Sequence, residues 1–387
     1  MCAFPQLKAN ISCDVVVIGG GITGSLIADN LGKNGFNVVV VEQRDIAWGS
    51  SAASTALLQY EIDTHMADLA RMYGEFHAVA AYKACAAAIT DLRDLADELG
   101  DVDFGMRESL YFASKRGHRA ELREEYDLRI KHEFDAEWLD AGGVKERFGI
   151  KAPCAILTKL AAQIDPYRMA SKLLLRLAER GGRVFDRTVI DTIEPSEDKV
   201  TLQTPEGFRI QAGHVVMAAG YASQKWLKQS VAKNRSSYAF ITDPIEESAL
   251  GPLASTMIWE SARPYLYMRT TGDGRLLVGG DDDDIDIPAR RDRRVDSKAK
   301  GLCKKVRKLF PDLQMRPAFS WGGTFAETED GLPFFGEHPQ YGPRVQFALA
   351  YGGNGISYSM IGADLLRANI EGRLHPLAGL FGFSRVG

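Results

Sequence analysis

The sequence lacks the features that would place it in several common functional classes. No apolar run reaches the roughly 18 residues that a membrane-spanning helix requires. The N-terminus has no charged segment followed by an apolar one, as a secretory signal has. The net charge of −4 over 387 residues contrasts with the strongly basic character of a general nucleic-acid-binding protein. We therefore predict a cytoplasmic protein, at most peripheral to a membrane, with no nucleic-acid partner.

Cysteine and histidine are scattered rather than grouped. The cysteines are odd in number and form no CxxC pair, which argues against a disulfide framework and against a zinc site. The seven histidines show no metal-ligand spacing. We expect free thiols in a reducing compartment and no bound metal. The five cysteines are Cys2, Cys13, Cys85, Cys154 and Cys303.

What the chain does contain is a βαβ pattern close to its start. A continuous apolar strand is expected at Cys13–Ile18, an amphipathic helix at Ile22–Asn34 with Gly35 as its stop, and a second apolar strand at Asn37–Val41. Strands that are apolar at every position are typical of a parallel sheet buried on both faces. We therefore predict an α/β fold.

The rest of the chain divides by its periodicity. The stretch from Ser236 to Gly280 alternates at period two with turn signals between segments, which indicates an antiparallel sheet. Other expected helices are 64–99, 166–180 (with Asp165 as N-cap before Pro166), 298–310 and 356–371, and other expected strands are 104–114, 183–193, 199–202, 214–219 and 345–350. We predict a discontinuous nucleotide-binding domain, residues 1–103, 150–231 and 322–387, with an inserted substrate-binding domain, residues 104–149 and 232–321.

The loop between the first strand and helix carries a dinucleotide fingerprint. Gly19, Gly21 and Gly24 form GxGxxG, in which the glycines permit a tight turn, a close approach of the backbone to a pyrophosphate, and close packing of helix on strand. The pyrophosphate would lie at the N-terminus of the helix that begins near Ile22. Glu42 ends the second strand and can accept hydrogen bonds from ribose hydroxyls. At this point the dinucleotide could be NAD or FAD.

Four further segments, in order along the chain, resemble the D-amino-acid oxidase-like family of FAD enzymes, the glycine oxidase and sarcosine oxidase type. They are WGSSAASTALL (Trp48–Leu58), VVMAAGYAS (Val215–Ser223), GGTFAETEDGLPFFGE (Gly322–Glu337) and AYGGNGISYS (Ala350–Ser359). The resemblance implies FAD, a Rossmann-like FAD-binding domain of the glutathione-reductase type with an inserted antiparallel-sheet domain, and dehydrogenation of a C–N bond.

The resemblance and the fingerprint together give a set of expected FAD-binding residues. Glycines at 352, 353 and 355 leave room for a flat ring, and the following helix N-terminus can stabilise negative charge that develops on it. The expected residues are Gly19, Gly21, Ile22, Thr23, Gly24, Glu42, Gln43, Arg44, Ser50, Ser51, Ala53, Ser54, Leu57, Val189, Ala219, Gly220, Asp330, Gly352, Gly353, Asn354, Gly355 and Ile356.

The chain departs from the family pattern at three places. The positions at which relatives attach the flavin through cysteine or histidine fall near Gly323 and Ala53, so we expect noncovalent FAD. The arginine that holds the substrate carboxylate in glycine oxidase is matched by Phe325, and the lysine that sarcosine oxidase uses with oxygen is matched by Leu277. The electron acceptor is therefore left open between oxygen and an unidentified carrier.

Candidate substrate contacts lie in the inserted sheet and beside the last glycine loop. Tyr265, Tyr267 and Arg269 alternate and should share one face of a strand, with Arg269 holding a carboxylate and the tyrosines boxing an amine. Phe240 and Phe325 are expected as apolar walls, and Tyr351 as a further lining residue. The run Asp281–Asp284 is expected to be a charged surface loop.

The sequence thus predicts an FAD-dependent oxidoreductase that removes hydride from the carbon next to nitrogen in a small amine or amino acid, after which the imine hydrolyses. No acid–base residue is assigned. A 2-hydroxy acid dehydrogenase and a flavoprotein subunit of a larger amine dehydrogenase stay open as alternatives, as does the oligomeric state.

Overall fold

The βαβ unit has the predicted form in the computed structural model, which describes residues 3–386. Strands β1 (Ile11–Ile18) and β2 (Val38–Val41) are parallel neighbours, and helix α1 (Ile22–Lys33) connects them. Alternate residues of β1 belong to different cores, Val15 and Val17 to the helical side and Val16 to the other. Both faces are therefore covered, which explains why these strands are apolar at every position.

The first sheet is built mainly from parallel strands. β1 lies between β2 and β10 and pairs with both in parallel, and β17 pairs with β10 in parallel. The strands in spatial order are β16 (Phe334–His338), β17 (Gly342–Leu349), β10 (Arg209–Met217), β1, β2 and β7 (Arg183–Phe185). In addition, β9 (Val200–Gln203) pairs with β10, and β8 (Thr192–Pro195) pairs with β9.

The second sheet is antiparallel except for one pair, β12 with β4. In spatial order it contains β15 (Pro317–Glu327), β11 (Lys233–Pro244), β14 (Arg275–Asp283), β13 (Leu266–Thr270), β12 (Thr256–Glu260), β4 (Gly105–Phe112), β6 (Cys154–Gln163) and β3 (Leu57–Gln59), with β5 (Ala136–Asp140) paired to β6.

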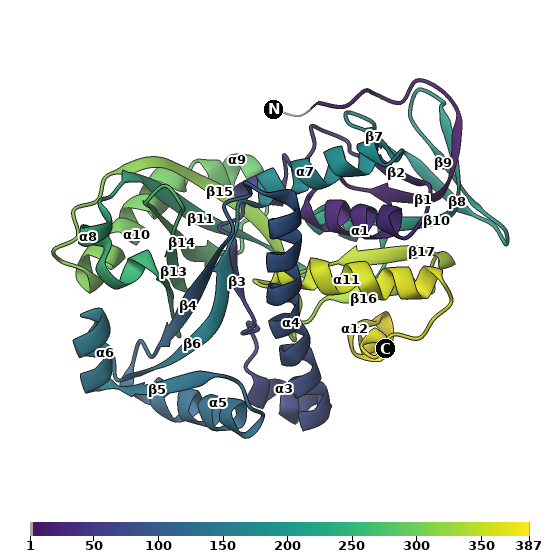
Figure 1. Cartoon of the computed structure of the whole chain (residues 1–387). Coiled ribbons are helices and arrows are strands. Elements are labelled where there is room, and N and C mark those ends of the chain that lie inside the picture. The colour runs from purple at the N-terminus through teal and green to yellow at the C-terminus, as the bar shows by residue number, and fades with distance from the viewer. Residues whose placement is uncertain (1–2, 387) are drawn as a thin grey trace.

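The two sheets lie on opposite sides of the long helix α4, and the C-terminus lies on the side of the first sheet (Figure 1). Helices α1, α7 and α11 pack against one face of the first sheet, and α4 packs on α11 and contacts β3 and β6 of the second sheet. Helix α10 covers one face of the second sheet. The helices are α2 (Ser50–Ala53), α3 (Met66–Tyr73), α4 (Glu75–Leu99), α5 (Arg119–Lys131), α6 (Ala141–Phe148), α7 (Pro166–Glu179), α8 (Glu247–Leu250), α9 (Pro288–Asp292), α10 (Val295–Leu309), α11 (Gly355–Ile370) and α12 (Ala378–Phe381).

Two expected elements are divided in the structure. The helical region predicted over 64–99 is two helices, because Gly74 between α3 and α4 adopts a φ of 85° that ends the first helix. The strand predicted over 183–193 is β7 and β8, separated by a turn at Arg187, whose φ is 46°. Asp165 caps α7 as expected, with its carboxylate accepting from the N–H groups of Tyr167 and Arg168.

The predicted domain boundary at residue 150 does not coincide with a boundary between sheets. β6 and β3 were expected in the nucleotide-binding domain, yet β6 pairs with β4 and β5, and β3 pairs with β6, in the second sheet. The end of β15, after residue 322, also stays paired with β11. The division of the chain into two domains stays a prediction.

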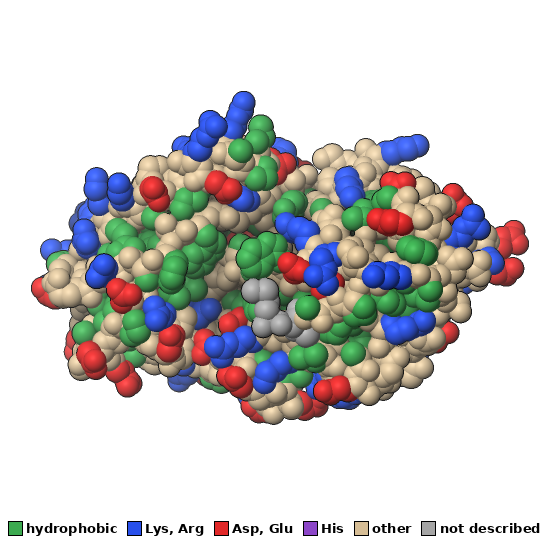
Figure 2. Space-filling model, turned by 90° about the horizontal axis from the view of Figure 1, so that it is seen from above, with side chains coloured by type: hydrophobic (Ala, Val, Ile, Leu, Met, Phe, Trp, Pro, Cys, Tyr) green, Lys and Arg blue, Asp and Glu red, His purple; other side chains and the backbone are tan. Residues whose placement is uncertain are grey.

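The structure also describes the cysteines, the possible membrane and metal sites, and the distribution of surface charge. Cys13, Cys85, Cys154 and Cys303 are free, and Cys2 lies outside the described residues. Within residues 3–386, no helix has the length and apolar character needed to cross a membrane, and no group of three or more His, Cys, Asp or Glu side chains is placed to hold a metal ion. Acidic and basic side chains are interspersed on the face shown in Figure 2.

Candidate active site

A cavity of about 710 Å³ is lined by residues of both sheets and by the fingerprint loop. This volume is within the roughly 300–1,000 Å³ typical of sites for small molecules and cofactors. One part of its lining comes from the loop after β1 and the end of β2, and another from β11, β13, β14 and β15 of the second sheet. The last glycine loop, Gly352–Gly355, contributes to the lining between β17 and α11.

The fingerprint glycines are required by close backbone contacts. Gly19 has a φ of 117°, and a Cβ there would lie 2.3 Å from the carbonyl oxygen of Ala218. A Cβ on Gly24 would lie 1.9 Å from the carbonyl oxygen of Gly19. Gly21 is the N-cap of α1 and faces the cavity. The loop can therefore keep its backbone close both to β10 and to a ligand.

Polar groups in and beside this loop are placed where they can bind a dinucleotide. Oε2 of Glu42 accepts from the N–H of Gly20 and Oε1 accepts from the N–H of Arg44, both at 2.9 Å. Each oxygen keeps a lone pair that a ribose hydroxyl can use. The N–H of Ile22, in the first turn of α1, donates to Oγ of Ser51 at 2.8 Å. Such helix N-termini favour bound phosphate.

The glycine loop before α11 is held by side chains from the segment after β3. Oδ2 of Asp63 accepts from the N–H of Gly353 at 2.7 Å. The side-chain amide of Asn354 donates to the carbonyl oxygens of Gln59 and Glu61, both at 2.9 Å. Oγ1 of Thr23 and Oγ of Ser359 are 2.8 Å apart, which joins the first turns of α1 and α11. Two helix N-termini therefore meet at the cavity.

Aromatic side chains form the wall contributed by the second sheet. Tyr265, Tyr267 and Trp259 line the cavity, and the rings of Trp259 and Tyr265 meet edge to face with centroids 6.4 Å apart. The Tyr267 hydroxyl lies 3.1 Å from Oγ of Ser237. A Cβ on Gly279 would lie 2.3 Å from the Tyr267 ring. The ring can therefore occupy its position only because residue 279 has no side chain.

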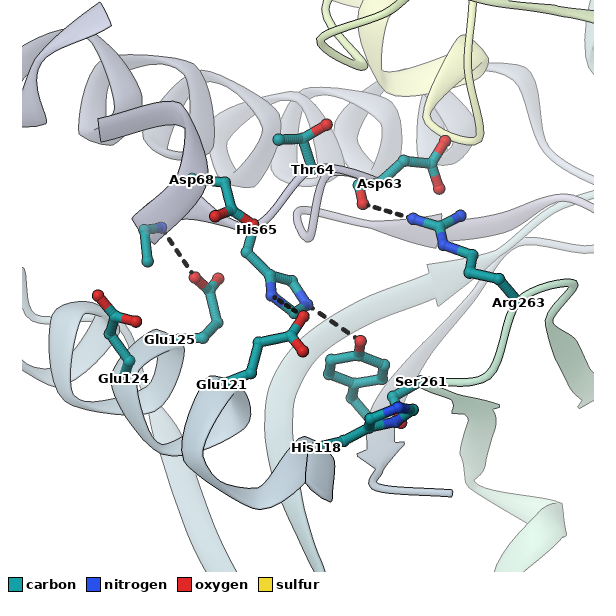
Figure 3. A network of polar contacts seen from close by, with 12 residues as sticks. Asp63, Thr64, His65, Asp68, His118, Glu121, Glu124, Glu125, Ser261 and Arg263 are labelled. Carbon is teal, nitrogen blue, oxygen red and sulfur yellow. Dashed lines mark hydrogen bonds and ion pairs between the residues drawn. The ribbon is translucent and has the colours of Figure 1, made fainter. Parts of the chain in front are cut away.

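A polar network supports this wall from behind (Figure 3). The ring of Tyr111 stacks on Trp259 with centroids 3.8 Å apart, and its hydroxyl is 3.0 Å from Nε2 of His65. Nδ1 of His65 is 3.2 Å from Oε1 of Glu121 on α5. Burial lowers the pKa of His65, against the opposing effect of Glu125 and Glu121. Since neither His65 nor Tyr111 lines the cavity, the network has a positioning role at the wall.

Most of the predicted site residues meet at this cavity. Among the substrate candidates, Tyr265, Tyr267, Phe325 and Tyr351 line it. The predicted cofactor residues that line it are Gly19, Gly21, Ile22, Thr23, Glu42, Gln43, Arg44, Ser50, Ser51, Ala53, Ser54, Leu57, Val189, Ala219, Gly220, Gly352, Gly353, Asn354, Gly355 and Ile356.

The prediction that Arg269 holds a substrate carboxylate is wrong. Its side chain is 3% exposed and is absent from the cavity lining. The guanidinium donates to three carbonyl oxygens, those of Thr55 at 2.6 Å and of Thr270 and Ile164 at 3.2 Å. Burial lowers its pKa to about 10, against the opposing effect of Asp103 and Asp165. The residue shares a strand face with the tyrosines, but the cavity ends before it.

Three other predicted residues also lie outside the lining. Phe240 is fully buried in the core between the second sheet and α10. Asp330 accepts from the Tyr73 hydroxyl at 2.8 Å and forms an ion pair with Arg385 at 2.7 Å. Gly24 lies inside α1, where it serves the helix–strand packing that the fingerprint requires.

Several lining residues were not predicted from the sequence. Trp259, Ser237 and Glu327 come from the second sheet, whereas Glu61 and Asp63 come from the segment after β3. The carboxylate of Asp282 also lines the cavity, although its run was expected at the surface. Strand parity alone would place Asp282 with Leu276 and Val278, which lie in the core under α10. The irregular pairing of β11 with β14 at Gly280 reverses this direction, and strand alternation gave no signal for it.

The parallel sheet with its glycine loop, Glu42 and two helix N-termini at one cavity define a dinucleotide-binding oxidoreductase fold. Residues 14–368 match the FAD dependent oxidoreductase family, and the chain belongs to that family. The protein is therefore an FAD-dependent oxidoreductase, as the sequence predicted.

The chain is similar to several characterised members. It is 24% identical to gamma-glutamylputrescine oxidoreductase of Escherichia coli K12 over 95% of this chain and 87% of that protein. It is 26% identical to glycine oxidase of Geobacillus kaustophilus HTA426, over 84% of this chain and 85% of that protein. The crystal structure of a Geobacillus kaustophilus glycine oxidase covers 96% of this chain and 98% of its own, with a TM-score of 0.82 at 21% identity.

The residues present fit FAD. The cradle of Gly19 to Gly21 has no side chain that fills it, and a Cβ on Gly21 would meet Oγ of Ser51 at 3.1 Å. The carboxylate of Glu42 has free lone pairs at the end of β2. At the glycine loop, Gly352 has a φ of 88° and Gly353 would place a Cβ 3.0 Å from Asp63, so neither position can carry a side chain without displacing the loop.

Proposed function

We propose that this FAD-dependent oxidoreductase oxidises the C–N bond of an amine substrate bound against the wall of Trp259, Tyr265 and Tyr267. That aromatic wall, in the same cavity as the glycine loop Gly352–Gly355, is the observation that carries the proposal. Aromatic faces attract positively polarised amine groups and exclude water from the reacting carbon. The similarity to glycine oxidase and to gamma-glutamylputrescine oxidoreductase supports an amine over other substrates.

The chemistry needs little from the chain beyond placement. FAD, when bound, supplies the hydride acceptor, its N5 atom. The substrate carbon next to nitrogen loses a hydride, the nitrogen lone pair forms the double bond, and water then hydrolyses the imine to a carbonyl compound and an amine. An uncharged amine requires no base for the hydride step, which is consistent with our assigning no acid–base residue.

The chain's own residues would hold the cofactor at two places. Gly19–Gly21 and the first turn of α1 would bind the pyrophosphate, and Glu42 would bind the ribose. The N-terminus of α11 at Gly355 would stabilise negative charge on the ring. Asp63 positions Gly353 in that loop through its hydrogen bond.

Two finer points belong to the same proposal. We propose noncovalent FAD, because the family's attachment positions carry Gly323 and Ala53. The electron acceptor is oxygen or an unidentified carrier; Leu277, which replaces the family's lysine, is buried in β14 at 5% exposure and offers no charge.

Anaerobic reduction of the flavin tests the proposal. The holoenzyme is mixed with a panel of primary and secondary amines, α-amino acids and 2-hydroxy acids, and bleaching of the flavin band is followed. Reduction by an amine supports the proposal. Reduction by hydroxy acids alone would identify a hydroxy acid dehydrogenase instead, and reduction by amines only after a partner chain is added would identify a subunit of a larger enzyme.

A further inference from the structure

The four consecutive aspartates that end β14 have different surroundings. Asp281 forms an ion pair with Lys305 at 2.7 Å, Asp283 with Arg294 at 2.6 Å, and Asp284 with Arg235. Asp282 forms none with any described residue, and its Oδ1 is enclosed without a hydrogen-bond partner. It is also the only one of the four that lines the cavity.

A local irregularity in the sheet directs Asp282 inward. The pairing of β11 with β14 shifts register between Ser236 and Tyr238, where Gly280 has a φ of 133° and Asp281 a φ of 57°. Bulges of this kind re-aim side chains, often beside active sites. Asp282 thereby lies beside Ser237, whose hydroxyl contacts Tyr267 of the aromatic wall.

The other carboxylates that line the cavity already have partners. Glu42 accepts two backbone N–H groups, Glu61 pairs with Arg129 at 3.3 Å, Asp63 accepts from Gly353, and Glu327 pairs with Arg235. The basic residues of the lining are Arg44, beside Glu42 in sequence, and the exposed Lys225. Asp282 is therefore a negative group of the cavity wall to which the described part of the chain offers no ion-pair partner.

We propose that Asp282 pairs with a cationic nitrogen of the substrate, distinct from the nitrogen whose C–N bond is oxidised, so that the preferred substrates are diamines or polyamines. This inference rests on the proposed amine oxidation. The reacting nitrogen must be uncharged to supply its lone pair, and pairing it with a carboxylate would keep it protonated. The positive charge that satisfies Asp282 must then be a second one.

The electrostatic surroundings of Asp282 support this pairing. The pKa of Asp282 is raised to about 6, mainly by burial and also by the charges of Asp63 and Glu327, whereas the Ser237 hydroxyl and Arg263 oppose the rise. The Tyr267 hydroxyl, with a pKa raised by burial to about 12, is neutral and faces the same space. At neutral pH Asp282 is thus an ionised carboxylate in an acidic environment, and a bound ammonium group would stabilise it.

The experiment compares Asp282→Asn with wild-type holoenzyme on α,ω-diaminoalkanes of three to six carbons and on the monoamines of the same length. We expect kcat/KM for the best diamine to fall about 10- to 100-fold in Asp282→Asn, the usual effect of losing one charge-assisted hydrogen bond. The change for the matched monoamine should stay below about threefold. Protonation of the reacting amine lowers kcat/KM with falling pH in both enzymes. In the wild type the diamine profile should fall more steeply below about pH 6, as Asp282 protonates, and this additional fall should be absent in Asp282→Asn.

Asp281→Asn is the matched control, since it removes the neighbouring charge outside the cavity and asparagine tolerates the left-handed backbone there. It should leave both substrate series unchanged, and an unaltered flavin spectrum confirms that each variant is folded and loaded. Equal losses on diamine and monoamine would place Asp282 at the reacting nitrogen and overturn the inference, as would unchanged kinetics on diamines. If no amine reduces the wild-type flavin, the proposed function itself fails.

Discussion

Arg269 shows how far the parity of a single residue can be trusted. Period-two alternation correctly placed Arg269 on the same face of β13 as Tyr265 and Tyr267, but it could not show where the cavity ends along that face. The end is set by Thr55 and Ile164, distant in sequence, whose carbonyl oxygens reach the guanidinium. Contacts of this kind have no local signal in the sequence.

The geometry gives Arg269 a testable structural role. Arg269→Lys should lower the free energy of unfolding by about 2–4 kcal/mol, because a lysine cannot satisfy three carbonyl oxygens in one plane and leaves buried acceptors unpaired. Urea unfolding measures this. KM for an amine substrate should change less than about twofold; a raised KM with unaltered stability would return Arg269 to the substrate site.

Some residues of the site could be predicted from the sequence and others could not. Gly19, Gly21 and Glu42 could be predicted because a dinucleotide imposes fixed spacing on a strand–loop–helix. Asp63 and Trp259 could not, because each reaches the cavity from a different segment and belongs to no spaced motif. Asp282 was assigned to the surface from the charge of its neighbours, whereas the bulge at Gly280 directs it to the cavity.

At the scale of elements, the sequence patterns of adjacent residues predicted individual strands and helices, but not which strands pair. The apolar strands β1 and β2 and the capped helix α7 lie within two residues of their predicted bounds because burial on both faces and an N-cap followed by proline are properties of adjacent residues. The assignment of β3 and β6 to the second sheet depends on pairing between distant segments. Pairing partners are chosen by tertiary packing, which a single strand's sequence does not encode.

The loop between β1 and α1 carries the second prediction. Gly21→Val should abolish FAD binding, since its branched side chain would occupy the cavity at the start of α1 where the pyrophosphate is expected, and would also press on Oγ of Ser51. The ratio of flavin to protein absorbance in the purified variant measures this. Circular dichroism should show a folded chain, because the position faces the cavity and not the core. Full flavin content would exclude this loop as the pyrophosphate site.

At the scale of the whole molecule, the two sheets lie on either side of α4 (Figure 1), and residues of both line the cavity. The first sheet supplies the fingerprint loop and the second supplies the aromatic wall and Asp282. A ligand that contacts both would bind the folded chain and not the unfolded one, and would therefore stabilise the whole arrangement. The two sheets were predicted from their different periodicities. That both would line one cavity was implied only by the family resemblance.

The last prediction concerns how the cofactor is held in this cavity. Gly323 and Ala53, which stand where relatives attach the flavin, lie on the cavity wall, and a Cβ on Gly323 would be 3.0 Å from the Cβ of Ala53. Within residues 3–386, no cysteine or histidine lines the cavity. Acid denaturation should therefore release yellow FAD into the supernatant, and the intact mass of the precipitated chain should equal that of the polypeptide alone. Colour in the precipitate together with a flavin-sized mass increase would contradict noncovalent binding, and peptide mapping would then identify the attached residue, Cys2 included.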